Sequence, residues 1–91
     1  MGRLRSDKPE EPPPPLFDTT LGRTFFDLRT TLGASVWDMA RLVDSEPTTI
    51  ANLEAGALDA LPAWTELTRI VEAYGALTGT DTGPLLTRFM K

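Results

Sequence analysis

The segment SVWDMARLVDSEPTTIANLEAG, from Ser35 to Gly56, contains two short helical patterns separated by a turn. Ser35 stands three positions before Asp38, a spacing typical of a capped helix start. The apolar residues that follow recur at helical spacing and predict a helix of about eight residues. These residues are Val36, Met39, Ala40 and Val43.

The second pattern begins directly after Asp44. Ser45 is the expected cap, proline is tolerated in the first turn of a helix, and Gly56 is expected to end it. Ile50 and Leu53 occupy the inward positions of this second short helix. Two short helices joined by three or four residues, and flanked by longer ones, are the geometry of a helix-turn-helix.

The spacing of the inward residues supports this interpretation. Ala40 leaves room where the two helices cross, Val43 and Ile50 fill the space beneath the turn, and Leu53 anchors the second helix. A generic helical bundle is the alternative, although it would not require a small residue at the crossing together with a cap just after the turn.

Outward from this segment, three more helices are expected. The first presents Leu21, Phe25, Leu28 and Leu32 and stops at Gly33. After a loop that holds Leu58 and Leu61, Pro62 opens a longer helix that ends at Gly79 and presents Trp64, Leu67, Ile70, Val71, Tyr74 and Leu77. A last short helix starts near Asp81 or Thr82 and offers Leu85, Leu86 and Phe89. The predicted fold is all-α, a compact bundle of about five short helices that contains a helix-turn-helix.

Residues 1–16 differ in composition from the rest of the chain. They hold five of the eight prolines and almost no apolar side chains, so they cannot offset the entropy of ordering. We therefore expect a disordered or polyproline-II tail over 1–16, with a ligand for a proline-binding groove as the alternative. The helix-turn-helix domain is predicted to span 17–91.

The composition limits the possible chemistry. The 91 residues contain no Cys and no His, which removes the usual zinc ligands and nucleophile–base pairs, and the formal charge is -4. Carboxylates such as Glu54, Asp59, Glu66 and Glu72 lack a second catalytic group at a meaningful spacing. We expect no enzyme activity, no cofactor, no metal and no small-molecule substrate. Without a signal peptide or an apolar run of roughly 20 residues, the expected compartment is the cytoplasm.

Two stretches resemble a known family. The pattern Gly22-x-x-Phe25-x-x-x-Arg29-x-x-x-Gly33-x-Ser35-x-x-Asp38-x-Ala40, followed by Ile50-x-x-Leu53-Glu54-Ala55-Gly56-x-x-x-x-Leu61-Pro62, resembles the lambda-repressor/Cro helix-turn-helix superfamily. The segments 53–62 and 74–79 are most similar to its RodZ-type subclass. That resemblance implies the cytoplasmic N-terminal domain of a longer, membrane-anchored bacterial protein. Such a domain binds an actin-like cytoskeletal filament through the helix after the helix-turn-helix pair.

The superfamily also implies an alternative function, sequence-specific DNA binding as a transcriptional regulator. Its repressors read bases from the start of the second helix, which corresponds here to Glu46, Pro47, Thr48, Thr49 and Asn52. Only Asn52 is a usual base reader, and no residue of this helix is basic. The polar contact candidates are Thr48, Thr49 and Asn52, and the nearby cations are Arg29 and Arg41. An ion pair with Asp38 is the structural interpretation of Arg41.

The aromatic residues favour a protein partner. Phe26 and Trp37 lie outside the apolar stripes of their helices, so both are expected to be at least partly exposed, as residues of protein contact surfaces are. The alternative is that both side chains fold onto a groove and complete a thin core. Trp64 lies near the start of the helix that carries the contact surface in RodZ-type domains, although it also shares the core stripe. The resemblance aligns Glu66 and Ile70 with aromatic positions of that contact helix. The sequence therefore predicts a non-catalytic protein-binding module.

Overall fold

The computed structural model describes residues 17–90, and in that range the chain is entirely helical apart from its turns and one isolated bridge between Phe17 and Ala57. The predicted all-α fold is confirmed. Residues 1–16, with the predicted disordered tail, and residue 91 lie outside the described residues. The elements are α1 (Thr19–Leu32), α2 (Val36–Leu42), α3 (Pro47–Ala55), the 3₁₀ turn η3 (Leu58–Ala60), α4 (Trp64–Thr78) and α5 (Gly83–Phe89).

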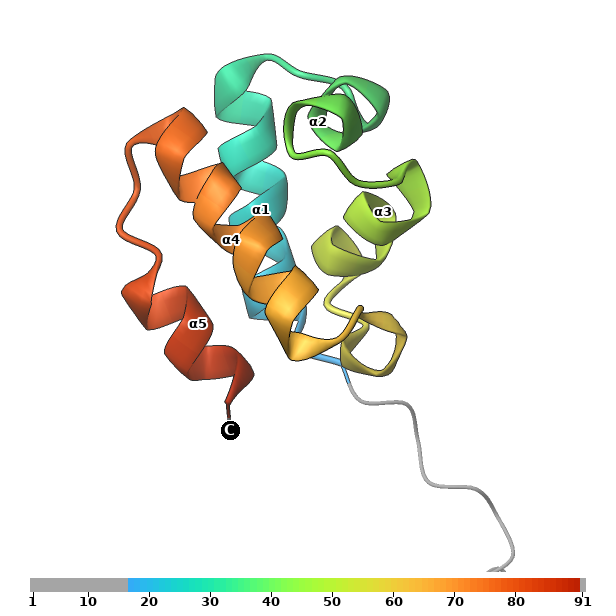
Figure 1. Cartoon of the computed structure of the whole chain (residues 1–91), viewed down its shortest axis with the longest axis vertical. Helices are drawn as coiled ribbons and strands as arrows, with labels where there is room; N and C mark the ends of the chain where they lie inside the picture. Colours follow the sequence, from blue (N-terminus) through green and yellow to red (C-terminus); the bar gives the residue numbers. More distant parts are fainter. Residues whose placement is uncertain (1–16, 91) are drawn as a thin grey trace, which may run out of the picture.

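Two long helices form the centre of the bundle. α1 and α4 pack against each other, with the α2–α3 pair on one side and α5 on the other (Figure 1). α3 contacts both α1 and α2, while α5 contacts α4. The turn η3 connects the end of α3 to the start of α4 and closes one end of the bundle.

Most helix ends follow the local sequence signals. The Asp18 carboxylate accepts a hydrogen bond from the Leu21 amide at 3.0 Å, and the Ser35 hydroxyl accepts one from the Asp38 amide at 3.0 Å. These side chains occupy amides that have no partner within their helices. At the other ends, positive φ angles end α1, α3 and α4 at the predicted glycines, which are Gly33, Gly56 and Gly79.

Two predicted helix starts are wrong. The N-terminal cap of α3 is Glu46, not Ser45, and it makes no side-chain capping bond. Pro47 is the first helical residue, a position where proline is favoured because its fixed φ suits the helix and its missing amide hydrogen would have no partner within the helix. Likewise, α4 begins at Trp64 and not at Pro62, because the backbone is still extended on both sides of the proline, at Leu61 and Ala63.

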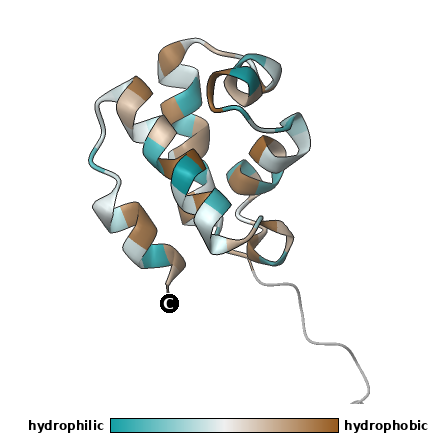
Figure 2. Ribbon diagram, in the orientation of Figure 1, coloured by the Kyte–Doolittle hydropathy of each residue, from teal (hydrophilic) through white to brown (hydrophobic). Residues whose placement is uncertain are grey.

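The core draws on the predicted apolar stripes. Hydrophobic and hydrophilic residues alternate along the helices, as Figure 2 shows for α4. Three stripe members are nevertheless exposed, namely Leu32, Trp64 and Leu77, all near the first or last turn of a helix, where the neighbouring helix no longer covers the surface. The buried hydrophobic residues are Leu21, Phe25, Met39, Ala40, Val43, Ile50, Leu53, Leu67, Ile70, Val71 and Tyr74.

The start of α1 is fixed to the end of α3. The Asp18 amide donates to the Gly56 carbonyl at 2.8 Å, beside the bridge between Phe17 and Ala57. One turn further along α1, Gly22 is buried against the same segment, and a Cβ atom there would lie 2.4 Å from the Glu54 carbonyl oxygen. Glycine at position 22 therefore allows the two helices to approach this closely.

The C-terminal helix is fixed by an ion pair. The Arg88 guanidinium donates to both carboxylate oxygens of Asp18, at 2.6 and 2.9 Å, and so joins α5 to the start of α1. This hydrogen bond from Arg88 is the main reason that the pKa of Asp18 lies below its ordinary value. The ionised carboxylate therefore stabilises the fold more than the protonated one does.

We expect acid to weaken the ion pair of Asp18 with Arg88, because the Asp18 carboxylate becomes protonated in the folded protein. Because the folded-state pKa of Asp18 is lowered, its contribution to stability is present above the unfolded pKa of about 3.9 and is lost as the pH falls through the folded value. Asp18→Asn keeps a side-chain acceptor for the helix cap but not the charge, and should flatten the loss of thermal stability below about pH 4. Arg88→Met removes the largest of the interactions that lower the pKa of Asp18 and should flatten the loss in part, because the Leu21 amide still donates to the Asp18 carboxylate. If thermal stability fell below about pH 4 as steeply in both variants as in the wild type, the ion pair of Asp18 with Arg88 would not be the source of this loss.

Candidate interaction surface

The turn between α2 and α3 is held in place by α4. Arg69 donates to the carbonyl oxygens of Val43 and Asp44, at 2.7 and 2.8 Å, and also pairs with Glu66 on its own helix. Asp44 has a positive φ of 55°, a conformation that non-glycine residues rarely adopt. The contacts from Arg69 thus stabilise a strained turn and fix the angle between the two short helices.

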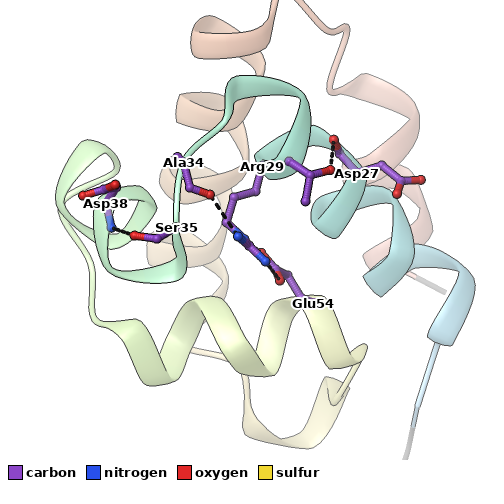
Figure 3. Close-up of polar contacts among 7 residues, drawn as sticks. Asp27, Arg29, Ala34, Ser35, Asp38 and Glu54 are labelled. Atoms are coloured by element: carbon purple, nitrogen blue, oxygen red, sulfur yellow. Dashed lines mark hydrogen bonds and ion pairs between the residues drawn. The ribbon is translucent and has the colours of Figure 1, made fainter.

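A second arginine joins α1 to α3. Arg29 donates to both carboxylate oxygens of Glu54, at 2.5 and 2.9 Å, and to the Ala34 carbonyl in the loop before α2 at 2.9 Å (Figure 3). The side chains of Arg29 and Glu54 are only 12% and 10% exposed. The hydrogen bond to Glu54 raises the pKa of Arg29, so the charged guanidinium is favoured at this position.

This geometry corrects the expected role of Arg29. A contact with a phosphate or a protein partner needs an exposed guanidinium, whereas this one is largely buried and bonded to Glu54 and Ala34. Arg29 is therefore structural. Arg41, by contrast, is exposed and forms the predicted ion pair with Asp38, at 2.7 Å, so that prediction is confirmed.

The arginines of residues 17–90 share one property: each is paired with a carboxylate. Ten Asp and Glu residues in this range stand against five arginines, so the described surface has a surplus of negative charge. Neutralising phosphates requires cations that are not already compensated. The pairs are Arg23 with Asp27, Arg29 with Glu54, Arg41 with Asp38, Arg69 with Glu66, and Arg88 with Asp18.

The start of α3 presents polar but uncharged candidates beside an acid. Thr48 is exposed, while Thr49 and Asn52 are half-buried. Glu46 is exposed at the cap position of α3. A negative charge at this point opposes a phosphate, and no described residue of α3 is basic.

Phe26 is partly exposed, as predicted, and lies beside a recess between α1 and α3. The guanidinium carbons of Arg23 and Arg29 are each 5.3 Å from the centre of its ring, within the range of cation–π attraction. Thr19, Arg23, Glu54 and Ala55 complete a recess of about 330 Å³. The two cations hold the ring against α1, which limits its freedom to meet a partner.

Trp64 is 47% exposed at the first turn of α4, so its assignment to the core stripe is wrong. Its side chain borders a recess of about 150 Å³ that is lined only by apolar residues. An exposed indole beside such a recess is typical of protein contact sites. The other lining residues, contributed by the η3 region, α4 and α5, are Leu58, Leu61, Pro62, Leu67 and Phe89.

Two further predicted contact residues of α4 behave differently. Ile70 is fully buried in the core, so the prediction that it contacts a partner directly is wrong. Its place in the apolar stripe of α4 indicates burial, whereas the contact role expected for it follows only from the resemblance. Glu66 is partly exposed, and its hydrogen bond from Arg69 lowers its pKa. Glu66 thereby also orients the arginine that holds the turn.

Trp37 is 68% exposed on α2, which confirms its predicted exposure. The next residue on α2, Asp38, borders a hollow of about 400 Å³ between the end of α1 and α2. Leu42, 54% exposed, borders the same hollow and was not among the predicted contact residues. It lies outside the stripe of α2, as Trp37 does, and the same reasoning would have found it.

Comparisons with protein-family models, with curated proteins and with solved structures found no match to this chain. Within residues 17–90, no group of three acidic side chains is placed to hold a metal ion. No helix in that range has the length and apolar character needed to cross a membrane.

Proposed function

We propose that this domain is a non-catalytic helix-turn-helix module of the RodZ type that acts through protein–protein contacts. The α2–α3 pair, its four-residue turn over 43–46 and the long helix that follows support this assignment. The observation that carries the proposal is electrostatic: within 17–90 every arginine is paired with a carboxylate, while two tryptophans stand exposed.

The partner surface that we propose is the start of α4. Trp64 and the apolar recess beside it offer a rigid aromatic anchor and a pocket for one apolar side chain of the partner. By resemblance, the partner is a cytoskeletal or membrane-associated protein. The domain would face it from the cytoplasm, tethered through sequence that is not part of this chain.

The second candidate is sequence-specific DNA binding. It is favoured by one observation, the exposed Thr48 in the first turn of α3 with the exposed Arg41 on the preceding helix. Binding of a DNA reader depends on counterion release by several cations, and Arg41 alone is a poor source of it because Asp38 neutralises it. We therefore rank this function second.

Site-specific photocrosslinking separates the two functions. A photoreactive phenylalanine analogue at position 64 or position 48, in the protein expressed in its native host, reports what each surface touches. We expect protein adducts from position 64 and no nucleic-acid adducts from position 48. The same analogue at Glu72, exposed two turns along α4, is the matched control. DNA adducts from position 48, with none to protein from position 64, would reverse the ranking.

A further inference from the structure

The outer face of α2 carries two apolar and two charged side chains, and the charged residues lie between the apolar ones along the helix. Trp37 and Leu42 are its apolar ends, and the ion-paired Asp38 and Arg41 lie between them. Because successive residues of an α-helix are rotated by about 100° around its axis, these four positions lie within an arc of roughly 140° of the helix circumference. Met39 and Ala40, on the opposite side of the helix, are buried in the core. The face is therefore turned away from the rest of the domain.

A hollow continues this face toward the end of α1. It holds about 400 Å³ and is bordered by Leu32, Gly33, Ala34, Asp38, Arg41 and Leu42. Leu32 is exposed there although it belongs to the apolar stripe of α1. Two exposed leucines and the ion pair of Asp38 with Arg41 border this hollow, so it combines apolar and charged groups. Trp37 is exposed at the neighbouring position on α2.

The order of the four residues selects the occupant. Trp37 and Leu42 are centred on the same point of the helix as Asp38 and Arg41, halfway between positions 39 and 40. If a second α2 helix lies antiparallel across this point, each tryptophan meets the leucine of the other copy. In the same register, each Asp38 meets the Arg41 of the other copy. A single antiparallel register thus forms both the apolar contacts and the ion pairs between the two copies, as a two-fold symmetric interface requires.

We propose that the outer face of α2, with the adjoining hollow, binds a second copy of this chain in a two-fold symmetric dimer. The indole of each copy occupies the hollow of the other, and the two ion pairs exchange partners across the interface. Because α2 has seven residues and is about 10 Å long, the interface is small and the dimer is weak. It leaves Trp64 and the start of α3 free, so it goes beyond the proposed function and does not depend on it.

Sedimentation equilibrium of the full chain from micromolar to millimolar concentration tests the dimer. We expect an apparent mass that rises toward twice the monomer mass. Trp37→Ala should weaken self-association about tenfold or more, as truncating an interface tryptophan does. Trp64→Ala, which truncates the other exposed tryptophan, is the matched control and should leave it unchanged. A wild-type chain that stays monomeric throughout overturns the proposal.

Charge variants test the antiparallel register itself. Asp38→Arg gives this face two cations and Arg41→Asp gives it two anions, so each variant alone should be monomeric. A mixture of the two should form a heterodimer, because opposite charges then meet at both positions. Thermal unfolding of each variant verifies that it is folded. Self-association that persists in Trp37→Ala and in both charge variants would place the interface elsewhere and overturn the proposal.

Discussion

Replacing Glu54 with alanine is expected to lower the free energy of unfolding by about 3 to 5 kcal/mol. The Arg29 guanidinium would then be left nearly buried with one remaining acceptor, the carbonyl of Ala34. Removing one partner of a buried ion pair leaves an uncompensated charge, which costs far more than the pair itself contributes. The contacts that orient α3 against α1 would loosen together with it.

Urea unfolding of the variant and of a matched control measures this effect. Asp27→Ala removes the carboxylate of the exposed pair with Arg23 on α1, the helix that also carries Arg29. It should lower the free energy of unfolding by less than about 1 kcal/mol. The double variant Arg29→Met with Glu54→Leu should recover much of the loss, because no charge remains buried. A loss below about 1 kcal/mol in Glu54→Ala would show that the pair behaves as an exposed one.

Replacing Gly22 with alanine is expected to lower the free energy of unfolding by about 2 kcal/mol, although the same change inside an exposed helix raises stability by up to about 1 kcal/mol. The added Cβ would lie 2.4 Å from the Glu54 carbonyl oxygen and 2.6 Å from the Gly56 amide nitrogen. Both are backbone atoms, which cannot rotate away, so α1 has to move away from α3.

Thermal unfolding separates this crowding from backbone strain. Gly33→Ala is the control, because its Cβ would meet no atom within 4 Å and only its positive φ of 75° makes the substitution unfavourable. We expect Gly33→Ala to cost about 1 kcal/mol and Gly22→Ala to cost more. A stability equal to or above that of the wild type in Gly22→Ala would contradict the close packing of α1 on α3.

Local signals explain what the sequence predicts well. Gly33, Gly56 and Gly79 end their helices as expected, because a left-handed C-terminal residue depends only on the adjacent turn. The Ser35 cap is equally local. The cap of α3 lies one residue after the predicted Ser45, because Pro47 takes the first helical position, where proline is favoured, and the residue before it becomes the cap.

The contacts that position the site join residues far apart in the sequence. Arg29 meets Glu54 across 25 positions, and Arg69 reaches Val43 across 26. No periodicity within one helix predicts such pairs, because they depend on how the helices cross. The exposure of Trp64 has a similar cause, since the apolar stripe of α4 continues one turn beyond the surface that its neighbours cover.

The most direct test of the central claim is the affinity for duplex DNA as a function of salt. If the paired arginines make this a protein-binding module, affinity at about 50 mM salt should be no tighter than the micromolar, non-specific range. Nanomolar binding that falls steeply with salt, and that is lost in Thr48→Ala or Asn52→Ala, would contradict the proposed function and establish a DNA reader.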